Sequence, residues 1–168
     1  MAQRPTRRAR ESTGRSSTRL DDQLCFALYA ATHRIQRLYR PLLDRLDLTY
    51  PQYLVLLVLW EDDDLIVTNI GQRLSLNSAT LTPLLKRMEA ADLIERRRST
   101  EDGRKVTISL RPKGWALQKD VEAIAAEVAA AAANATPDAV ALRETLSDLR
   151  DALPDQPGVM ERRDPVGH

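Results

Sequence analysis

The sequence is poor in the residues that build metal and redox centres, with one cysteine and two histidines among 168 residues. A single thiol excludes a disulfide within the chain, a four-thiolate zinc site and a redox pair of cysteines in one subunit. His33 has no second histidine at metal-ligand spacing, since the other one is the terminal His168. We therefore predict no metal and no cofactor.

Long apolar runs are also missing. None reaches the roughly 18 residues of a membrane-spanning helix, and the Arg-rich beginning lacks the apolar segment of a secretory signal. Together with the free thiol, these absences indicate a reducing cytoplasm. Neither a phosphate-binding glycine loop nor a Ser-His-Asp set is present, so we expect a protein that is not an enzyme.

The net charge is only +1, but the basic residues are unevenly placed. Residues 1–20 carry six Arg against one Glu, and residues 65–111 carry nine Lys or Arg against five acidic residues. The rest of the chain is net acidic. A basic middle segment between acidic flanks is typical of a protein in which one region faces phosphate, so this distribution favours nucleic acid binding.

Leu and Ala at helical spacings predict a mainly α protein with a small β element. A long first helix is expected from Thr18 or Asp21, which form a capping-box pattern, to about Arg45, with Pro41 as a candidate kink. Its apolar residues form a seam that requires another helix, either of the same chain or of a second subunit. The seam consists of Leu24, Leu28, Ala31, Ile35, Leu38 and Leu42.

Three shorter helices are predicted to follow. Thr49 and Pro51 mark the start of the first, which is apolar on all sides and therefore buried. The other two, residues 67–74 and 78–91, are separated by three residues, and Asn77 is the expected N-cap of the second. Two helices joined in this way predict a helix-turn-helix, whose second helix enters the major groove of DNA.

The second of these helices offers a polar face with candidate DNA contacts. The candidates are Asn77, Ser78, Thr80, Thr82, Lys86 and Arg87. A solvated helix face is the alternative interpretation. A basic hairpin next to this face makes DNA contact the stronger hypothesis, because one phosphate-facing surface explains both features.

Residues 93–98 and 105–110 predict two strands joined by a hairpin with an Asp-Gly turn. This wing adds Arg96 and Arg104 to the candidate DNA contacts, and Arg104 suits a narrow minor groove. Asp102 is expected to orient a wing arginine by ion pairing, and a plain solvent turn is the alternative.

Two further helices, about residues 113–134 and 137–153, complete the expected organisation. The chain then divides into a disordered Arg-rich arm (1–18), a helical dimerisation region (19–48 and 112–153), a winged helix-turn-helix DNA-binding region (49–111) and a frayed tail (154–168). The expected fold class is mainly α with a small β wing.

Between Thr49 and Gly114 the sequence resembles the multiple-antibiotic-resistance regulator (MarR) family of winged-helix repressors. The residues that carry the resemblance are Leu48-Thr49-Tyr50-Pro51-Gln52, the stretch from Leu81-Thr82 to Leu93-Ile94-Glu95-Arg96, and Asp102-Gly103-Arg104 followed by Leu110-Arg111-Pro112-Lys113-Gly114. The stretch from Thr80 to Glu89, with Cys25 near the N-terminus, is more narrowly similar to the organic hydroperoxide resistance regulators (OhrR). The resemblance implies a homodimeric repressor that binds double-stranded operator DNA.

The resemblance also implies a redox sensor. Members of that subfamily keep one reactive cysteine in the first helix and two tyrosines that donate hydrogen bonds to its thiolate, and the matching residues are Cys25, Tyr39 and Tyr50. With no second cysteine, the chain resembles the one-cysteine kind. An organic hydroperoxide would oxidise Cys25 to a sulfenic acid, which would either pass to a mixed disulfide with a small thiol or be overoxidised. Tyr29, one turn after Cys25, is a third candidate partner and equally fits ordinary packing.

Spacing limits how this site can form. Cys25 and Tyr39 are fourteen residues apart on one helix, about 21 Å along its axis, so they cannot touch within one chain. If both serve one site, the tyrosine comes from the other subunit of a dimer. Asp21 and Asp22 oppose ionisation of the thiol, so hydrogen-bond donors are needed to stabilise the anion.

Other interpretations remain open at this point. Cys25 is also explained as a small apolar residue beside the seam, and Tyr50 as a staple residue next to the helix cap. One rival function is a MarR-type repressor released by a small phenolic ligand, with Cys25 incidental. The other is a thiol peroxidase, which is disfavoured by the missing resolving thiol.

Overall fold

The computed structural model describes residues 18–98, 105–136 and 138–153. The elements in chain order are η1 (Leu20–Asp22), α1 (Leu24–Leu43), η2 (Asp44–Leu46), α2 (Tyr50–Glu61), β1 (Leu65–Ile66), α3 (Val67–Leu74), α4 (Ser78–Ala90), β2 (Ile94–Arg98), β3 (Val106–Leu110), α5 (Pro112–Ala116), α6 (Gln118–Ala135) and α7 (Ala139–Ala152). This confirms the mainly α fold with a small sheet. The predicted arm up to residue 17, the tail and the wing turn (99–104) lie outside the described residues.

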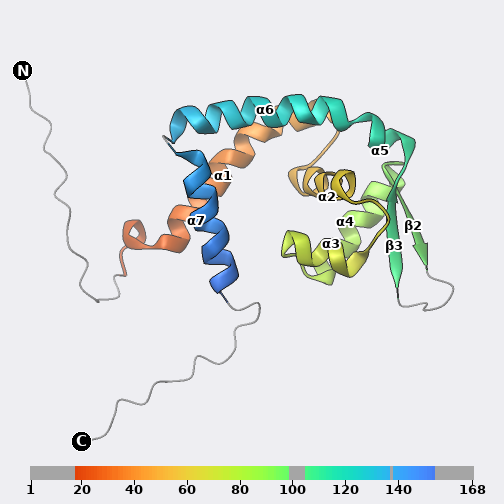
Figure 1. Cartoon of the computed structure of the whole chain (residues 1–168), viewed down its shortest axis with the longest axis horizontal. Helices are drawn as coiled ribbons and strands as arrows, with labels where there is room; N and C mark the ends of the chain where they lie inside the picture. The colour runs from red at the N-terminus through yellow and green to blue at the C-terminus, as the bar shows by residue number, and fades with distance from the viewer. Residues whose placement is uncertain (1–17, 99–104, 137, 154–168) are drawn as a thin grey trace, which may run out of the picture.

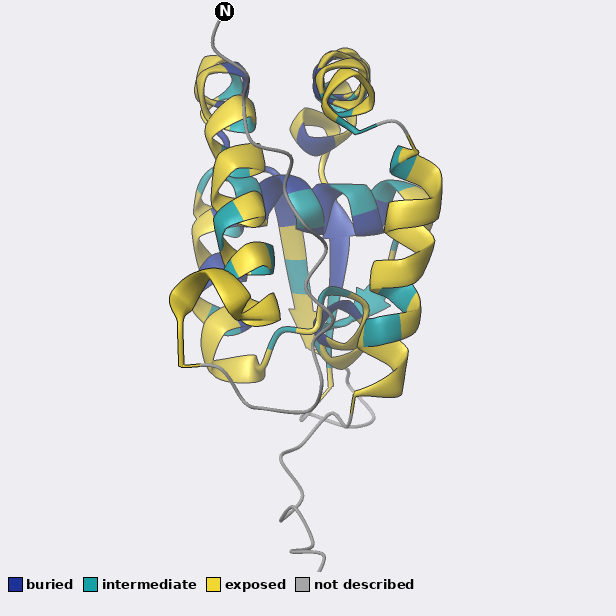
Figure 2. Ribbon diagram, turned by 90° about the vertical axis from the view of Figure 1, so that its left-hand side faces the viewer, coloured by how far each residue is buried: buried dark blue, intermediate teal, exposed yellow. Residues whose placement is uncertain are grey.

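Two regions are visible in Figure 1. The winged-helix unit, defined here as α2, α3, α4 and the sheet, lies at one side, and the helical frame, defined as α1, α6 and α7, lies above it and at the other side. α1 and α6 pack side by side. Figure 2 shows the buried residues in the middle of the molecule and mostly exposed residues on the helices of the frame.

The winged-helix unit is organised around α2. Thr49 donates to Gln52 Oε1 from its backbone nitrogen at 2.8 Å and from its hydroxyl at 3.0 Å, which fixes the start of the helix as predicted. Val55, Leu56 and Leu59 are fully buried, as expected for a core helix. Leu54, Leu57 and Trp60 are only half-buried, so the expectation of burial on all sides is wrong for this face of α2.

The predicted helix-turn-helix is formed by α3 and α4. The Asn77 side chain accepts a hydrogen bond from the Thr80 backbone nitrogen at 2.9 Å, so it is the N-cap that the sequence indicated. Ser75 turns the chain with a φ of 52°. A Cβ on Gly71 would lie 2.9 Å from the Leu76 carbonyl oxygen, and this glycine therefore allows the turn to pack against α3.

The sheet has the strand order β1-β3-β2 and is antiparallel. In the wing, Ile94 pairs with Leu110 and Arg98 pairs with Val106. The two-residue strand β1 was not predicted, because a pair of apolar residues carries no periodicity. It places Leu65 opposite Ile108 and ties the segment after α2 to the wing.

The helical frame differs from its prediction at its start. The expected capping box of Thr18 and Asp21 is wrong, because Asp21 lies in the 3-10 turn η1 and Gln23 returns to extended backbone before α1 begins. α1 continues through Pro41 to Leu43. The expected helix over 113–134 is divided into α5 and α6.

The apolar seam of α1 is only partly covered within the chain. Leu42 is buried, whereas Leu24, Ile35 and Leu38 keep 60%, 41% and 48% of their surface exposed. α7 has no buried residue at all, and its apolar residues Val140, Leu142 and Leu146 are exposed. None of the described helices is long and apolar enough to cross a membrane.

Candidate functional site

The helix α4 presents the candidate DNA-contacting residues on its outer side. Leu81, Leu84, Leu85 and Met88 are buried and fix one face of the helix in the core. The opposite face carries the predicted residues: Ser78, Thr80, Lys86 and Arg87 are exposed, and Thr82 is half-buried. The structure thus brings the candidates from α4 together on one outward surface.

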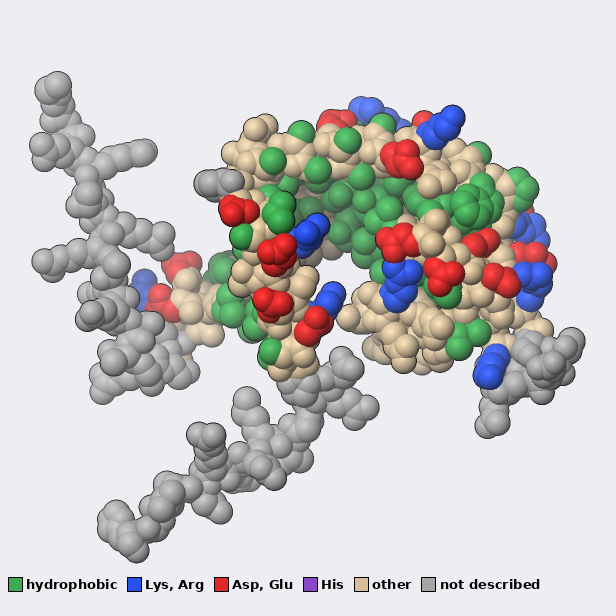
Figure 3. All heavy atoms as spheres, in the orientation of Figure 1, with side chains coloured by type: hydrophobic (Ala, Val, Ile, Leu, Met, Phe, Trp, Pro, Cys, Tyr) green, Lys and Arg blue, Asp and Glu red, His purple; other side chains and the backbone are tan. Residues whose placement is uncertain are grey.

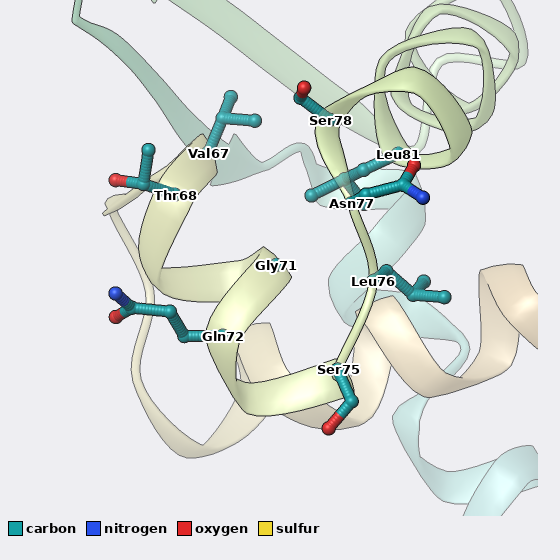
Figure 4. A pocket seen from close by; sticks show the side chains of 9 residues that line it. All are labelled: Val67, Thr68, Gly71, Gln72, Ser75, Leu76, Asn77, Ser78 and Leu81. Atoms are coloured by element: carbon teal, nitrogen blue, oxygen red, sulfur yellow. The ribbon is translucent and has the colours of Figure 1, made fainter. Parts of the chain in front are cut away.

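A shallow pocket of about 580 Å³ lies between α3 and α4, next to this surface (Figure 4). Thr68 and Gln72 of α3 line it together with Ser78 of α4, and all three are exposed. Sequence reasoning missed Thr68 and Gln72, although their position on the first helix of the helix-turn-helix could have indicated them.

The wing arginines differ in their surroundings. Arg96 is held against α4: its Nη1 lies 3.4 Å from Glu89 Oε2, its backbone nitrogen donates to Glu89 Oε1 at 3.3 Å, and its side chain is 22% exposed. It fixes the wing to α4 in this structure. The other predicted wing residues, Asp102 and Arg104, lie outside the described residues.

Arg97 belongs to a small network that joins the segment before β1 to the wing. Its Nη2 donates to Asp64 Oδ1 at 2.6 Å and to Ser109 Oγ at 2.8 Å, and the Ser109 hydroxyl donates to the same Asp64 oxygen at 2.6 Å. The hydrogen bond from Ser109 and the charge of Arg97 hold the pKa of Asp64 below its usual value. The network fixes the base of the wing.

Cys25 is exposed in the first turn of α1. Tyr29 is 62% exposed, and its ring meets that of His33 edge-on at 4.3 Å. Tyr39 lies near the other end of α1, so the structure does not bring the predicted thiol and this tyrosine together within one chain.

Two of the predicted sensor tyrosines do lie together, and a third joins them. Tyr39 of α1 and Tyr50 of α2 have ring centroids 5.2 Å apart, and Tyr53 of α2 lies 5.1 Å from Tyr39 and 5.7 Å from Tyr50. The hydroxyl oxygens of Tyr39 and Tyr53 are 3.5 Å apart. Tyr53 was not predicted as a site residue, although a tyrosine three positions after Tyr50 lies on the same helix face.

The tyrosine cluster, formed by Tyr39, Tyr50 and Tyr53, is partly withdrawn from water. Tyr53 is buried, and Tyr39 and Tyr50 are half-buried. Burial is the main cause that raises the pKa of Tyr50 and of Tyr53, and proximity to Tyr39 adds to both. These two phenols therefore stay protonated well above neutral pH and can act as hydrogen-bond donors.

Apolar side chains line a hollow between the frame and the winged-helix unit (Figure 3). A cavity of about 200 Å³ between α2 and α6 is lined by Leu57, Trp60 and Val121, among others. Trp60 donates from Nε1 to the Gly114 carbonyl oxygen at 3.2 Å. Together with the exposed apolar faces of α1 and α7, the hollow adds to the apolar surface that one chain leaves uncovered.

Comparison with known proteins supports the same interpretation of the fold. The chain is 45% identical to the HTH-type transcriptional regulator TtmR of Methylorubrum extorquens over 94% of its own length and 81% of that protein. It is 44% identical to the organic hydroperoxide resistance transcriptional regulator of Bacillus subtilis, over 80% of this chain and 92% of that one.

A solved structure of AbfR of Staphylococcus epidermidis, in its reduced form and bound to DNA, is also similar. It superposes with a TM-score of 0.69 at 32% identity and covers 79% of this chain and 90% of its own. The sequence profile of the family described as transcriptional regulator SarA/Rot matches residues 37–121. The chain therefore belongs to the SarA/Rot family of transcriptional regulators, which are winged-helix proteins of the MarR type.

Proposed function

We propose that the protein is a homodimeric repressor that binds operator DNA and releases it when an organic hydroperoxide oxidises Cys25. The observation that carries the proposal is the exposed thiol at one end of α1, with Tyr39 and Tyr50 gathered near the other end. The similarity to a regulator named for organic hydroperoxide resistance supports an organic hydroperoxide as the signal. The structure of a similar protein in its reduced form, bound to DNA, supports operator DNA as the binding partner.

The uncovered apolar surface supports the dimer. The seam residues Leu24, Ile35 and Leu38 of α1 and the apolar residues Val140, Leu142 and Leu146 of α7 stay exposed in one chain. A second copy would cover them, and it would also bring Cys25 of one subunit towards Tyr39 and Tyr50 of the other. The two α4 helices would then enter successive major grooves of a pseudo-palindromic operator, with the wings in the flanking minor grooves.

The contacts to DNA divide into two kinds. Lys86 and Arg87 on the exposed face of α4 supply charge to phosphates or base edges, while Ser78, Thr80 and Thr82 supply hydrogen bonds. Asn77 contributes as the cap that fixes the start of the helix. Arg104 and Asp102 remain proposed wing contacts, and Arg96 acts by holding the wing against α4.

The chemical step is an attack of the Cys25 thiolate on the terminal oxygen of the hydroperoxide. The sulfur–oxygen bond forms as the oxygen–oxygen bond breaks, and the alkoxide leaves with a proton as an alcohol. A small thiol then attacks the sulfenic acid, and a mixed disulfide forms with loss of water. Hydrogen bonds from Tyr39 and Tyr50 to the thiolate are lost, and Tyr29 is a third candidate for contact with the sulfur.

Release of DNA follows if the two subunits reorient when these hydrogen bonds are lost. A coupling of about 3 kcal/mol would weaken DNA binding more than a hundredfold. Each chain would consume one equivalent of peroxide, which distinguishes a sensor from a thiol peroxidase that turns over. A regulator of this kind acts where bacterial DNA lies, in the cytoplasm.

A gel-shift titration of operator DNA tests the proposal directly. The reduced wild type should bind, an organic hydroperoxide should release the DNA, and a thiol reductant should restore binding. Cys25→Ser should bind equally well and ignore the peroxide. If Cys25→Ser releases DNA as the wild type does, the thiol is not the sensor, and release by a phenolic ligand becomes the better hypothesis.

A further inference from the structure

We propose that Tyr53 is a positioning residue of the sensor site: its buried hydroxyl donates a hydrogen bond to the Tyr39 oxygen and so leaves the Tyr39 hydrogen for the Cys25 thiolate of the other subunit. The inference rests on the proposed function, because it adds a residue to the same sensor. Tyr53 does not reach the thiol itself in this arrangement and acts through Tyr39.

The geometry places Tyr53 behind Tyr39. Tyr53 is 4% exposed, whereas Tyr39 is half-buried and still reaches the surface. Their hydroxyl oxygens lie 3.5 Å apart, and among the described residues Tyr39 is the hydrogen-bond partner recorded for the Tyr53 hydroxyl. A buried hydroxyl needs an acceptor inside the protein, and for Tyr53 the Tyr39 oxygen is in place.

The count of hydrogens decides the direction of this bond. Each phenol has one hydrogen to donate and an oxygen that can accept. If Tyr39 donates to Tyr53, it has no hydrogen left for the thiolate. A thiolate can only accept, so its arrival beside Tyr39 favours the arrangement in which Tyr53 donates. The two hydrogen bonds, from Tyr53 to Tyr39 and from Tyr39 to the sulfur, then polarise each other, and the donation from Tyr39 to the sulfur becomes stronger.

The observed distance fits a pair that tightens when the anion binds. A separation of 3.5 Å is longer than the usual O–H···O distance of about 2.8 Å, so the pair is within reach without being tightly bonded. Burial raises the pKa of Tyr53, and the hydrogen bond with Tyr39 adds to the rise. Tyr53 therefore remains a neutral donor across the pH range in which a cysteine thiol ionises.

The experiment separates this role from packing by a double-mutant cycle. The rate of Cys25 alkylation by iodoacetamide is measured against pH in the full-length dimer for wild type, Tyr53→Phe, Tyr39→Phe and the double variant. Tyr53→Phe keeps the ring and removes only the hydroxyl. It should slow alkylation at pH 7 by about two- to fourfold and move the profile to higher pH. In the Tyr39→Phe background it should add nothing.

Circular dichroism at the assay temperature verifies that each variant is folded. If Tyr39→Phe shifts the pH profile of Cys25 alkylation and Tyr53→Phe leaves it unchanged, the role of Tyr53 is overturned and the sensor proposal stays intact. An equal shift from Tyr53→Phe in both backgrounds also overturns it, because the residue would then not act through Tyr39. If Tyr39→Phe alone leaves the profile unchanged, the proposed sensor site itself fails, and this inference fails with it.

Discussion

The winged-helix unit and the helical frame differ in how far a single chain completes them. In the unit, the core-facing apolar residues of α2 and α4 are buried, the starts of these two helices are capped, and an ionic network holds the base of the wing. In the frame, much of the seam of α1 remains exposed, and α7 has no buried residue. The well-packed winged-helix unit carries the proposed DNA-binding face, and the incompletely covered frame carries Cys25.

This difference in packing explains how one fold can bind DNA in one region and respond to a signal in the other. A well-packed unit keeps the spacing of side chains on α4 fixed, because close-packed cores resist deformation. In the proposed dimer, a frame that is completed by a second copy can adopt more than one arrangement, and a chemical change at its surface can favour one of them. The sensor belongs at such an interface.

The largest expected effect comes from a cavity in the core of the winged-helix unit. Leu56 is fully buried on α2. Leu56→Ala should lower the free energy of unfolding by about 3 kcal/mol, since it removes buried methyl groups and leaves a void. Chemical denaturation monitored by circular dichroism measures this, and a loss below about 1 kcal/mol would mean that α2 is not the centre of the core.

The same kind of substitution in the frame should act on association. Leu38 of α1 is 48% exposed in the single chain. Leu38→Ala should weaken dimerisation by about 1–2 kcal/mol and so raise the dissociation constant roughly 5- to 30-fold, because the partner subunit would otherwise cover this side chain. Sedimentation equilibrium gives the constant. An unchanged constant would contradict the use of this part of the seam as an interface.

A charge deletion distinguishes the two regions in DNA binding. Lys86→Ala, on the exposed face of α4, should weaken operator binding and lower the salt slope of the affinity by about one. Lys119→Ala, which removes an exposed charge from α6 in the frame, serves as the matched control and should leave the slope unchanged. Fluorescence anisotropy at several salt concentrations measures both. Equal slopes for the two variants would contradict the assignment of the α4 face.

The smallest effect concerns the pH dependence of the wing base. The pKa of Asp64 is lowered by Ser109 and Arg97, so its contribution to stability is present above the ordinary aspartate pKa of 3.8 and is lost as the pH falls through the lower pKa of the folded state. Because the Asp64 side chain is 62% exposed, screening limits this contribution to below about 1 kcal/mol.

Asp64→Asn should therefore destabilise the protein slightly at pH 7 and reduce the loss of stability on acidification. Asparagine tolerates the positive φ of 62° at this position, which makes the comparison fair. Unfolding free energies at pH 7 and near pH 3 test it, and parallel pH curves for wild type and variant would contradict the role of Asp64.

The sequence predicted the winged-helix unit better than the frame, and the reason is local. Asn77 and Thr49 fix helix starts within a few residues, so caps and apolar periodicity were sufficient for α2, α3 and α4. The failed capping box at Thr18 shows the limit, because the pattern was present but the backbone turned at Gln23.

Long-range contacts explain what the sequence did not predict. Tyr53 meets Tyr39 only after α1 and α2 have packed, and β1 is too short to show a pattern. Spacing alone placed Cys25 and Tyr39 out of reach within one chain. Spacing left open whether the seam of α1 packs within the chain. The exposed fractions of the seam side chains in the structure were needed to answer that question.

The central claim is that the sensor site is completed across two subunits, and mixed dimers test it most directly. In the first arrangement, a chain with Cys25→Ser pairs with a chain with Tyr39→Phe. The surviving thiol, on the second chain, then faces the intact Tyr39 of the first. In the second arrangement, both substitutions lie on one chain, which pairs with a wild-type chain. The surviving thiol of the wild-type chain then faces the substituted position.

The measurement is the rate at which the surviving Cys25 is oxidised by an organic hydroperoxide at neutral pH in each arrangement. The first arrangement should react at nearly the rate of the wild-type thiol, because its tyrosine donor is present. The second should react more slowly, because that donor is missing. Equal rates in the two arrangements would contradict a site shared between subunits.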